Sequence, residues 1–459
     1  MLIDDTITAI ASPPGNGAIA VIRVSGCKAL QITDKVFFSN AAEKKLSDQE
    51  AYTIHYGFIK DNEDIIDEVL VSVFRAPRSF TGEDSIEISC HGSLFIQQKI
   101  VNLLIKNGAR TAAPGEFTQR AFLNGKMDLS QAEAVADLIA SESAAAHKVA
   151  LQQMRGGFTN DLKDLRSQLL SFISLIELEL DFSEEDVEFA DRKQLKSLVT
   201  DIKEKIEELT ASFELGNVIK KGIPVAIAGE PNVGKSTLLN ALLNEDKAIV
   251  SDIAGTTRDA VEDVISLEGI LFRFIDTAGI RKTDDTIENL GIERTMQKIE
   301  KAEIILYMID ARDVKACDKL FEIRQKAKGK QLILVVNKID QSEVDISKQI
   351  EDCKDLKIVQ ISAKHKKNIG ELTNTLLEAV HYSPDINSGT IITNTRHFEL
   401  LQKALEASLR VNEALTSGIS GEFLAQDIRE ILNYIGEITG EFTTDEVLGN
   451  IFKNFCIGK

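Results

Sequence analysis

The sequence predicts a multi-domain protein of the α/β and α classes: an N-terminal α+β domain, an α-helical domain, and an inserted P-loop domain with a mostly parallel sheet. Short β-rich runs separated by turns fill the first quarter of the chain, and helical periodicity follows them. A phosphate-binding motif then follows an apolar run, after which helical periodicity returns. We therefore expect domains at 1–118, 119–215, 216–380 and 381–459, with the second and fourth forming one helical domain around the insertion.

Composition limits the class of protein before any motif is considered. The chain has 459 residues, of which 43% are hydrophobic and 27% charged, as in ordinary globular proteins with several cores. No export signal is visible, and the most apolar segment, 169–180, contains two glutamates, so we expect a cytoplasmic protein. The net charge of −19 excludes a surface that is basic overall, so a nucleic acid would need a local basic patch. The five cysteines are scattered without a C-x-x-C pair, and we expect free thiols.

The N-terminal domain is marked by β-rich runs at residues 18–26, 51–59, 68–76 and 85–92. A helix should follow over Ser93–Lys106, where apolar residues recur at helical spacing before an Asn-Gly stop. Cys90 and His91 are adjacent, but no partner spacing supports a nucleophile. We expect a structural pair at the end of a strand.

Helical periodicity begins after residue 118. Ser130 and Glu133 have the spacing of a capping box, from which we expect one helix to run to Met154. Further helices are expected at 161–180, 192–213, 399–415, 423–439 and 444–455. The acidic bend Asp181–Asp191 could bind a metal, but its spacing matches no known loop, so we expect a solvated, charged turn.

The P-loop motif runs from Gly229 to Ser236 as G-x-x-x-x-G-K-S, directly after the apolar run Pro224–Ala228. Its glycines allow backbone amides to surround phosphate oxygens, Lys235 would reach the β- and γ-phosphates, and Ser236 would hold Mg²⁺. A helix over Ser236–Leu243 would then point its N-terminus at the anion. Strand, loop and helix thus occur in the order that a nucleotide site requires.

Three downstream motifs extend this phosphate site to a GTPase. An alternating strand ends at Asp276, placed to bind Mg²⁺ through water, and the amide of Gly279 could reach a γ-phosphate. A second apolar strand ends at N-K-I-D, where Asp340 can accept hydrogen bonds from N1 and N2 of guanine and Asn337 can meet the acceptor edge of the base. The third motif, Ser362–Lys364, would close over the base. Together they predict a Ras-like P-loop GTPase domain that disfavours ATP.

Longer motifs occur throughout the chain. They are Thr6-Ile7 with Pro13-Pro14-Gly15, SFTGED at 79–84, PGEFTQRAFLNGKMDLSQAEA at 114–134, DIAGTTRD at 252–259, EITGEFTTDEVLGNIF at 437–452 and the terminal FCIGK. With them the chain resembles, over essentially its whole length, the tRNA-modification GTPase family called MnmE or TrmE. The resemblance implies a homodimer that works with a flavoprotein partner, called MnmG or GidA, in a heterotetramer or larger assembly. It also implies addition of a carboxymethylaminomethyl-type group to carbon five of wobble uridine in certain tRNAs, with GTP hydrolysis driving or gating that step.

The residue after the D-T-A-G turn is Ile280, which cannot orient a water as the glutamine of Ras-like enzymes does, and no arginine is obviously placed at the phosphates. The resemblance implies that potassium supplies the missing charge when two GTPase units pair, and that Glu288 orients the attacking water. The potassium ligands that it implies are Asn232, Ser251, Ile253 and Thr256. Thr257 would close on Mg²⁺ beside Ser236.

Motifs and resemblance together give one predicted set of GTP-binding residues. It comprises Gly229, Asn232, Val233, Gly234, Lys235, Ser236, Thr237, Thr256, Thr257, Asp276, Thr277, Ala278, Gly279, Asn337, Lys338, Asp340, Ser362, Ala363 and Lys364.

The resemblance further implies that the N-terminal domain has a folate-binding fold and forms the dimer. It would hold a tetrahydrofolate derivative, in the 5-formyl or 5,10-methylene form, as the source of a one-carbon unit. The positions that match folate contacts are Arg23, Glu87, Lys126 and Lys459. Cys456 could attack a one-carbon unit, but we favour a small packed residue in a terminus that folds into the folate pocket.

Two other functions stay open. A ribosome-assembly GTPase of the Era or Der kind would have a similar GTPase domain, although the chain contains no second P-loop and no clear KH-type G-x-x-G module. A potassium-dependent regulatory GTPase could bind folate only as a sensor. RNA nucleoside analysis of a deletion strain separates them: loss of the wobble-uridine adduct indicates modification, and an intact adduct with a precursor-ribosome peak indicates assembly.

Overall fold

The computed structural model describes residues 5–39, 44–181, 191–243, 263–275, 299–312, 323–325, 327, 329–341, 356–380, 390–417, 421–453 and 455–458. The chain divides into two compact units. Unit 1 comprises residues 1–139, 153–200 and 403–459, and unit 2 comprises residues 140–152 and 201–402. Three helices contribute residues to both units: α5 (Ala144–Met154), α7 (Arg192–Lys221) and α13 (Thr395–Ser417).

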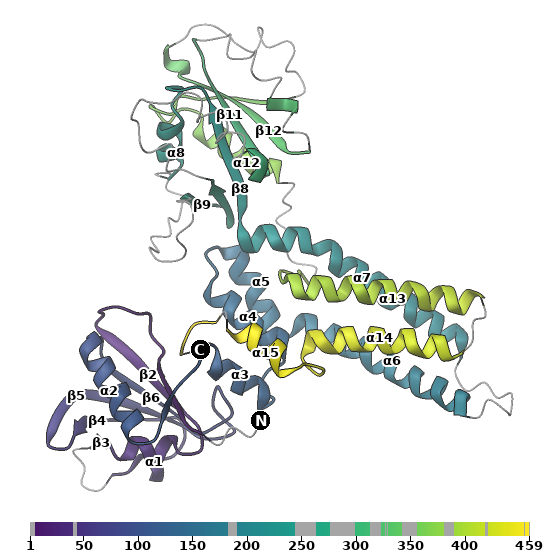
Figure 1. Ribbon diagram of the computed structural model, residues 1–459. Helices are drawn as coiled ribbons and strands as arrows, with labels where there is room; N and C mark the ends of the chain where they lie inside the picture. The colour runs from purple at the N-terminus through teal and green to yellow at the C-terminus, as the bar shows by residue number, and fades with distance from the viewer. Residues whose placement is uncertain are drawn as a thin grey trace. The chain divides into compact units, whose positions relative to one another are not determined.

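Unit 1 contains a seven-stranded sheet in the order β3-β4-β5-β6-β2-β1-β7, antiparallel except between β1 and β7 (Figure 1). Its strands are β1 (Ile7–Ile10), β2 (Ile19–Ser25), β3 (Phe37–Phe38), β4 (Thr53–Asp61), β5 (Asp64–Phe74), β6 (Ser85–His91) and β7 (Arg110–Thr111). The four β-rich runs of the sequence are thus confirmed as β2, β4, β5 and β6.

Two helices, α1 (Ala29–Asp34) and α2 (Leu94–Lys106), cover one face of this sheet. Alternate strand residues such as Ile22 and Ile86 form a buried core with them. Because side chains alternate between the faces of a strand, the paired residues Arg23 and Glu87 lie on the opposite face. Helix α2 confirms the expected helix, with Ser93 at its N-cap position.

The helices wholly within unit 1 beyond α1 and α2 are α3 (Glu116–Leu123), α4 (Leu129–Ile139), α6 (Gly157–Asp181), α14 (Gly421–Thr439) and α15 (Asp445–Phe452). Residues far apart in sequence pack together here, because α14 lies along α6 and α15 shares a core with α4. An ion pair between Arg429 and Glu177, 2.6 Å apart, also joins α14 to α6. Segments from both sides of the P-loop region therefore build one helical layer.

The start of α4 corrects one sequence expectation. Asp128, and not Ser130, is the cap: the Gln131 amide donates to Asp128 Oδ1 at 3.0 Å, and the Asp128 amide donates to Gln131 Oε1 at 2.9 Å. Ser130 lies inside the helix. The single helix expected up to Met154 is wrong as well, since α4 ends at Ile139 and α5 begins at Ala144. Ser143 starts the second helix by accepting the Ala146 amide at 3.1 Å.

Unit 2 contains a six-stranded sheet in the order β13-β12-β11-β8-β10-β9, parallel except between β9 and β10. The strands are β8 (Ile223–Gly229), β9 (Asp263–Leu267), β10 (Ile270–Phe274), β11 (Ile304–Asp310), β12 (Gln331–Asn337) and β13 (Lys357–Gln360). This mostly parallel sheet confirms the fold class predicted for the P-loop domain.

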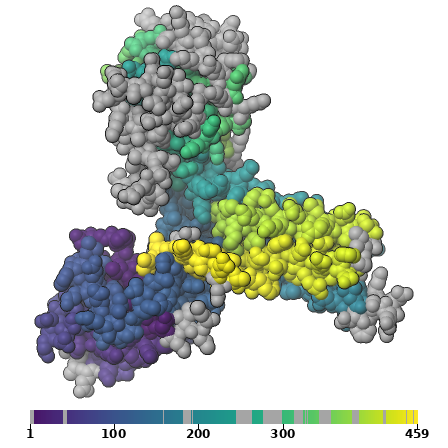
Figure 2. Space-filling view, in the orientation of Figure 1, coloured from purple at the N-terminus to yellow at the C-terminus, as the bar shows by residue number. Residues whose placement is uncertain are grey.

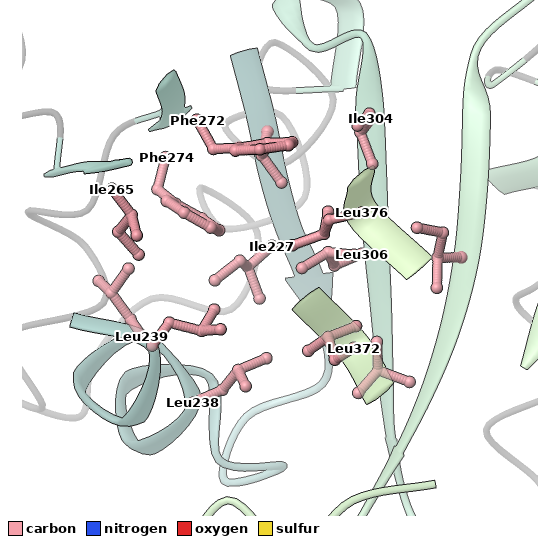
Figure 3. Packing of buried hydrophobic residues seen from close by; sticks show 14 of the residues in the cluster. Ile227, Leu238, Leu239, Ile265, Phe272, Phe274, Ile304, Leu306, Leu372 and Leu376 are labelled. Atoms are coloured by element: carbon pink, nitrogen blue, oxygen red, sulfur yellow. The ribbon is translucent and has the colours of Figure 1, made fainter. Parts of the chain in front are cut away.

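Helices α8 (Lys235–Leu243) and α12 (Ile369–Ala379) pack on one face of the sheet of unit 2. Figure 3 shows Leu239 directed toward Phe274, and Leu372 and Leu376 beside Leu306. The core anchors the start of α8 directly after β8, so the P-loop is held at both ends. Within the part of the chain that the structure describes, no helix is long and apolar enough to cross a membrane.

Candidate functional site

Three of the predicted nucleotide motifs meet at one edge of the sheet of unit 2. The P-loop follows β8, N-K-I-D spans the end of β12, and Ser362–Lys364 comes just after β13. In a parallel sheet the carboxyl ends of the strands lie at one edge, which is where ligands of such folds bind. A pocket of about 140 Å³ lies there, lined by Gly234, Thr237, Asn337, Lys338, Asp340, Gln341, Ser362 and Lys364.

Asn337 braces this pocket. It is 2% exposed, its Nδ2 donates to the Val233 carbonyl at 2.8 Å, and its Oδ1 accepts the Ala363 amide at 3.0 Å. One side chain thus joins the P-loop, the end of β12 and the loop after β13. The contact to guanine expected of Asn337 stays a prediction, whereas the brace between the loops was not foreseen.

The two P-loop glycines are required by the protein's own packing. A Cβ on Gly234, which has a φ of +99°, would lie 2.4 Å from Asn337 Nδ2. A Cβ on Gly229, with a φ of +149°, would lie 2.4 Å from the Met308 carbonyl of β11. Side chains are therefore excluded at both positions before any phosphate is considered.

Lys235 lies within the curve of the P-loop, where its Nζ donates to the carbonyls of Gly229 at 2.8 Å and Glu230 at 2.7 Å. These bonds hold a positive charge at the N-terminus of α8, which itself favours anions. Ser236 and Thr237 follow in the first turn of α8. The predicted phosphate and Mg²⁺ residues of the P-loop are thus brought together.

Lys338 braces the other side of the P-loop. Its Nζ donates to the Asn232 carbonyl at 2.7 Å and lies 2.8 Å from Asp310 Oδ2, at the end of β11. Hydrogen bonds from Arg312, and then from Lys338, hold the pKa of Asp310 well below its usual range. The carboxylate therefore stays charged and fixes Lys338.

Asp340 is the residue for which base recognition is predicted, and it lines the same pocket. Its Oδ1 accepts the Ser362 hydroxyl at 2.5 Å, and His365 Nε2 lies 3.7 Å from its Oδ2. The hydrogen bond from Ser362 is the main reason why the pKa of Asp340 lies below its usual value. An ionised carboxylate with remaining lone pairs is the acceptor that guanine N1 and N2 require.

Several predicted residues lie outside the part of the chain that the structure describes. In the GTPase domain these are Ser251, Ile253, Thr256, Thr257, Asp276, Thr277, Ala278, Gly279, Ile280 and Glu288, and in the N-terminal site Lys459. Most of the acidic bend at 181–191 also lies outside it.

A second cluster forms on the face of the sheet of unit 1 that lies opposite α1 and α2. Arg23 Nη2 lies 2.8 Å from Glu87 Oε1, and its Nη1 donates to the Gly458 carbonyl at 3.5 Å. The Arg23 guanidinium is also 5.5 Å from the ring centres of both Phe80 and Phe117. Arg23 and Glu87, two predicted folate contacts, are therefore brought together beside the C-terminal tail.

Lys126 is the third described folate candidate, and it forms a hydrogen bond with the segment that carries Phe80. Its Nζ donates to the Pro77 carbonyl at 3.0 Å. A Cβ on Gly82 would lie 3.3 Å from Lys126 Cγ. Lys126 thus reaches the same loop as Arg23 does, from the turn after α3.

Within unit 1 the C-terminal tail packs against N-terminal segments, and Figure 2 shows yellow and blue regions of the unit in contact. The Gly115 amide donates to the Cys456 carbonyl at 3.3 Å, and Gly458 packs so closely that a Cβ would lie 2.2 Å from the Ile10 carbonyl. The expectation of a packed Cys456 side chain is wrong, because that side chain is exposed. It is the backbone of the tail that packs.

Sequence reasoning missed two groups of charged residues. Asp67 accepts the His91 amide and pairs with His91 Nδ1, both at 2.7 Å, which holds His91 at the end of β6. Burial, with help from Asp67, raises the pKa of Cys90 to about 11, so this thiol is no nucleophile. The second group surrounds Arg120, which is 1% exposed. Its only sequence signal was the spacing of four between Glu116 and Arg120.

Comparison with known proteins places both units in one family. The family description "GTP-binding protein TrmE N-terminus" matches residues 6–126, and "MnmE helical domain" matches residues 129–456. The "tRNA modification GTPase MnmE" of Bacteroides thetaiotaomicron is 58% identical over 99% of both chains, and that of Flavobacterium johnsoniae is 54% identical over 100% of both. A solved structure of Aquifex aeolicus Era bound to GDP.AlF4- is 31% identical over 40% of this chain and 65% of its own, with a TM-score of 0.27 that is too low to support an inference. With the family descriptions and full-length relatives in agreement, this chain belongs to the MnmE family of tRNA modification GTPases.

Proposed function

We propose that this chain is a potassium-dependent GTP hydrolase that acts on tRNA in the cytoplasm. As a homodimer with a flavoprotein partner, MnmG (GidA), it adds a carboxymethylaminomethyl-type group to carbon five of wobble uridine, using a one-carbon unit from tetrahydrofolate. The observation that carries the proposal is the pocket at the edge of the sheet of unit 2, because it is lined by residues of three separate nucleotide motifs.

GTP binding follows from the described half of the site. Asp340, kept ionised by Ser362, accepts the N1 and N2 protons of guanine, which adenine lacks. The P-loop amides and Lys235 surround the phosphates. Ser236 and Thr257 would hold Mg²⁺, which neutralises charge that develops on the phosphates, and Glu288 would orient the attacking water.

Potassium fits the donor set at Asn232. The backbone carbonyl of Asn232 already accepts Lys338, and the residue is exposed with a φ of +63°. Its side-chain oxygen is therefore the donor that could face a cation beside the phosphates. Ser251, Ile253 and Thr256 would complete the site when two GTPase units pair, and the cation would supply the charge that an arginine supplies in other GTPases.

The chemistry of the residues around Arg23 suits the one-carbon carrier. Arg23 offers a guanidinium held by Glu87, with the rings of Phe80 and Phe117 nearby. Cations and aromatic rings suit the carboxylates and flat ring system of a folate. Lys126 and Lys459 would add charge at the same site.

GTP turnover in matched KCl and NaCl buffers at constant Mg²⁺ tests the potassium site. Turnover should be much faster in KCl, and a transition-state analogue should induce pairing of GTPase units, measured by light scattering. Asn232→Ala should remove most of the difference between the salts, whereas the exposed Asn368→Ala, at the start of α12, should keep it. Equal rates of the unmodified protein in both salts would refute the potassium site.

Nucleoside analysis tests the role in modification. A deletion strain should lose the adduct on wobble uridine and regain it with this chain. An intact adduct in the deletion strain would refute the role.

A further inference from the structure

The guanidinium of Arg120, on α3, is buried in a network of carboxylates within unit 1. It lies 2.9 Å from Glu116, 3.1 Å from Glu83 and 2.5 Å from Asp5. Arg110 pairs with Asp5 and Glu116 at 2.7 Å each, whereas Arg120 is the one cation with which Glu83 forms an ion pair among the residues that the structure describes. Both arginines therefore pair with Asp5 and Glu116, and Arg120 differs from Arg110 in its additional ion pair with Glu83.

Glu83 anchors the 75–84 loop, the segment between β5 and β6. The Ser25 hydroxyl donates to Glu83 Oε2 at 2.7 Å, and the Ser79 hydroxyl donates to the Glu83 carbonyl at 2.5 Å. Asn124, just after α3, donates to the Thr81 carbonyl at 2.7 Å. With Lys126 on Pro77, α3 and the turn behind it hold the 75–84 loop at three points.

The 75–84 loop carries Phe80 to Arg23. Phe80 is 39% exposed, and its ring centre lies 5.5 Å from the Arg23 guanidinium. Phe117, which lies 5.5 Å from the same guanidinium, is on α3, the helix that carries Arg120. One helix thus sets the positions of both rings around Arg23.

We propose that Arg120 is a positioning residue for the one-carbon-carrier site: through Glu83 it fixes the 75–84 loop, and so holds Phe80 against Arg23. The inference rests on the proposed function for the identity of the ligand, which Arg120 does not touch. Stability alone does not explain the network, because buried ion pairs can often be replaced by apolar residues without loss of stability. What an apolar replacement cannot do is direct the Glu83 carboxylate.

Two conservative variants test this role. Arg120→Lys keeps the charge but loses the forked geometry, and Glu83→Gln keeps the shape but loses the charge. Each should weaken binding of 5-formyltetrahydrofolate, measured by calorimetry on the full-length protein, roughly three- to tenfold, the range of a lost cation–π contact. Arg120→Lys combined with Phe80→Leu should bind no more weakly than Phe80→Leu alone, because both changes remove one interaction. GTP turnover should not change.

Arg110→Lys is the matched control, since it disturbs Asp5 and Glu116 but not Glu83. It should leave folate affinity unchanged. Hydrogen exchange without ligand adds a second readout: the amides of residues 76–84 should exchange faster in Arg120→Lys than in Arg110→Lys.

The outcomes separate the inference from the proposed function. Equal exchange in the two arginine variants, or equal loss of affinity, would overturn the positioning role of Arg120. A wild-type protein that binds no folate would overturn the assigned ligand, while the exchange experiment would still decide whether Arg120 orders the 75–84 loop.

Discussion

The two candidate sites of this protein are assembled in different ways. The GTP pocket takes its residues from loops that follow β8, β12 and β13, whose parallel pairing brings their carboxyl ends to one edge. The site around Arg23 combines two antiparallel strands, the 75–84 loop, α3 and the C-terminal tail. Motifs that follow parallel strands meet at the same edge of the sheet, so short motifs predict the first site. The second site has no such rule, because its residues come from elements of different kinds.

The sites also differ in what holds them. Close packing of glycines against neighbouring polar atoms and one buried amide shape the GTP pocket. A buried ionic network supports the Arg23 site. Substitutions in the GTP pocket should therefore change GTP binding or turnover alone, and substitutions around Arg23 should change folate binding alone.

The largest expected effect is that of Gly234→Ala. The added Cβ would meet Asn337 Nδ2 at 2.4 Å in a backbone conformation that disfavours side chains. We expect kcat/KM for GTP to fall by roughly 10²-fold or more, as when a positioned transition-state contact is lost. Steady-state GTP hydrolysis measures this, and folate binding should not change.

Gly370→Ala is the control, since a Cβ there meets nothing within 4 Å. Near-normal turnover of Gly234→Ala would show that the pocket tolerates a side chain at this position. That result would contradict the close packing of Gly234 against Asn337.

Asp340→Asn should have the next largest effect, on base selection. An amide at this position presents N–H groups toward the base edge where guanine also has donors, so GTP affinity should fall about 10- to 100-fold, as for a lost charged hydrogen bond. Xanthosine triphosphate, which has an acceptor at that edge, should be preferred. Competition binding with both nucleotides measures the change, and undiminished GTP affinity would contradict the role of Asp340.

Gly458→Ala should affect only the Arg23 site. The new Cβ would lie 2.2 Å from the Ile10 carbonyl, at a φ of +92°, so the tail must shift and its hydrogen bond with Arg23 would be lost. Folate affinity should fall by roughly tenfold, the value of about one hydrogen bond to a charged group. Gly449→Ala, in open space on α15, is the matched control. A parallel loss of GTP turnover would show that the sites are not separable in this way.

The smallest expected effect is that of acid on unit 1. Burial alone would raise the pKa of Glu116, but hydrogen bonds from Arg110, Ala113 and Arg120 bring it below the ordinary value of 4.5. A carboxyl group with a lowered pKa in the folded state contributes stability above its unfolded pKa, and this contribution is lost as the pH falls through the folded value. Urea denaturation followed by circular dichroism at pH 6 and pH 4 should show a loss that is smaller in Glu116→Gln. An identical loss in that variant would assign the acid sensitivity to other groups.

Sequence alone predicted the fold class. It also singled out the short motifs, with residues such as Gly234, Asn337 and Asp340, that line one pocket in the structure, because these motifs have fixed spacing. Their contacts with GTP stay predictions. Sequence alone could not predict the partners of Arg120, since Asp5 and Glu83 come from distant segments that only the tertiary fold brings to α3. It also misplaced the cap of α4, because Ser130 and Glu133 match the capping pattern as well as Asp128 and Gln131 do. Local patterns determine which residues can cap, and tertiary packing selects among them.

The brace at Asn337 has a consequence for how the sheet forms. Asp310 faces Asn337 across β11 and β12, and Val336 faces Gln360 across β12 and β13. If β12 slipped by one residue against its neighbours, the amide would point to the other side of the sheet, and the polar groups of Val233 and Ala363 would lose their shared partner. A misaligned β12 would therefore lose hydrogen bonds at the place where the nucleotide is proposed to bind. The pocket forms only when the strands pair in the correct register.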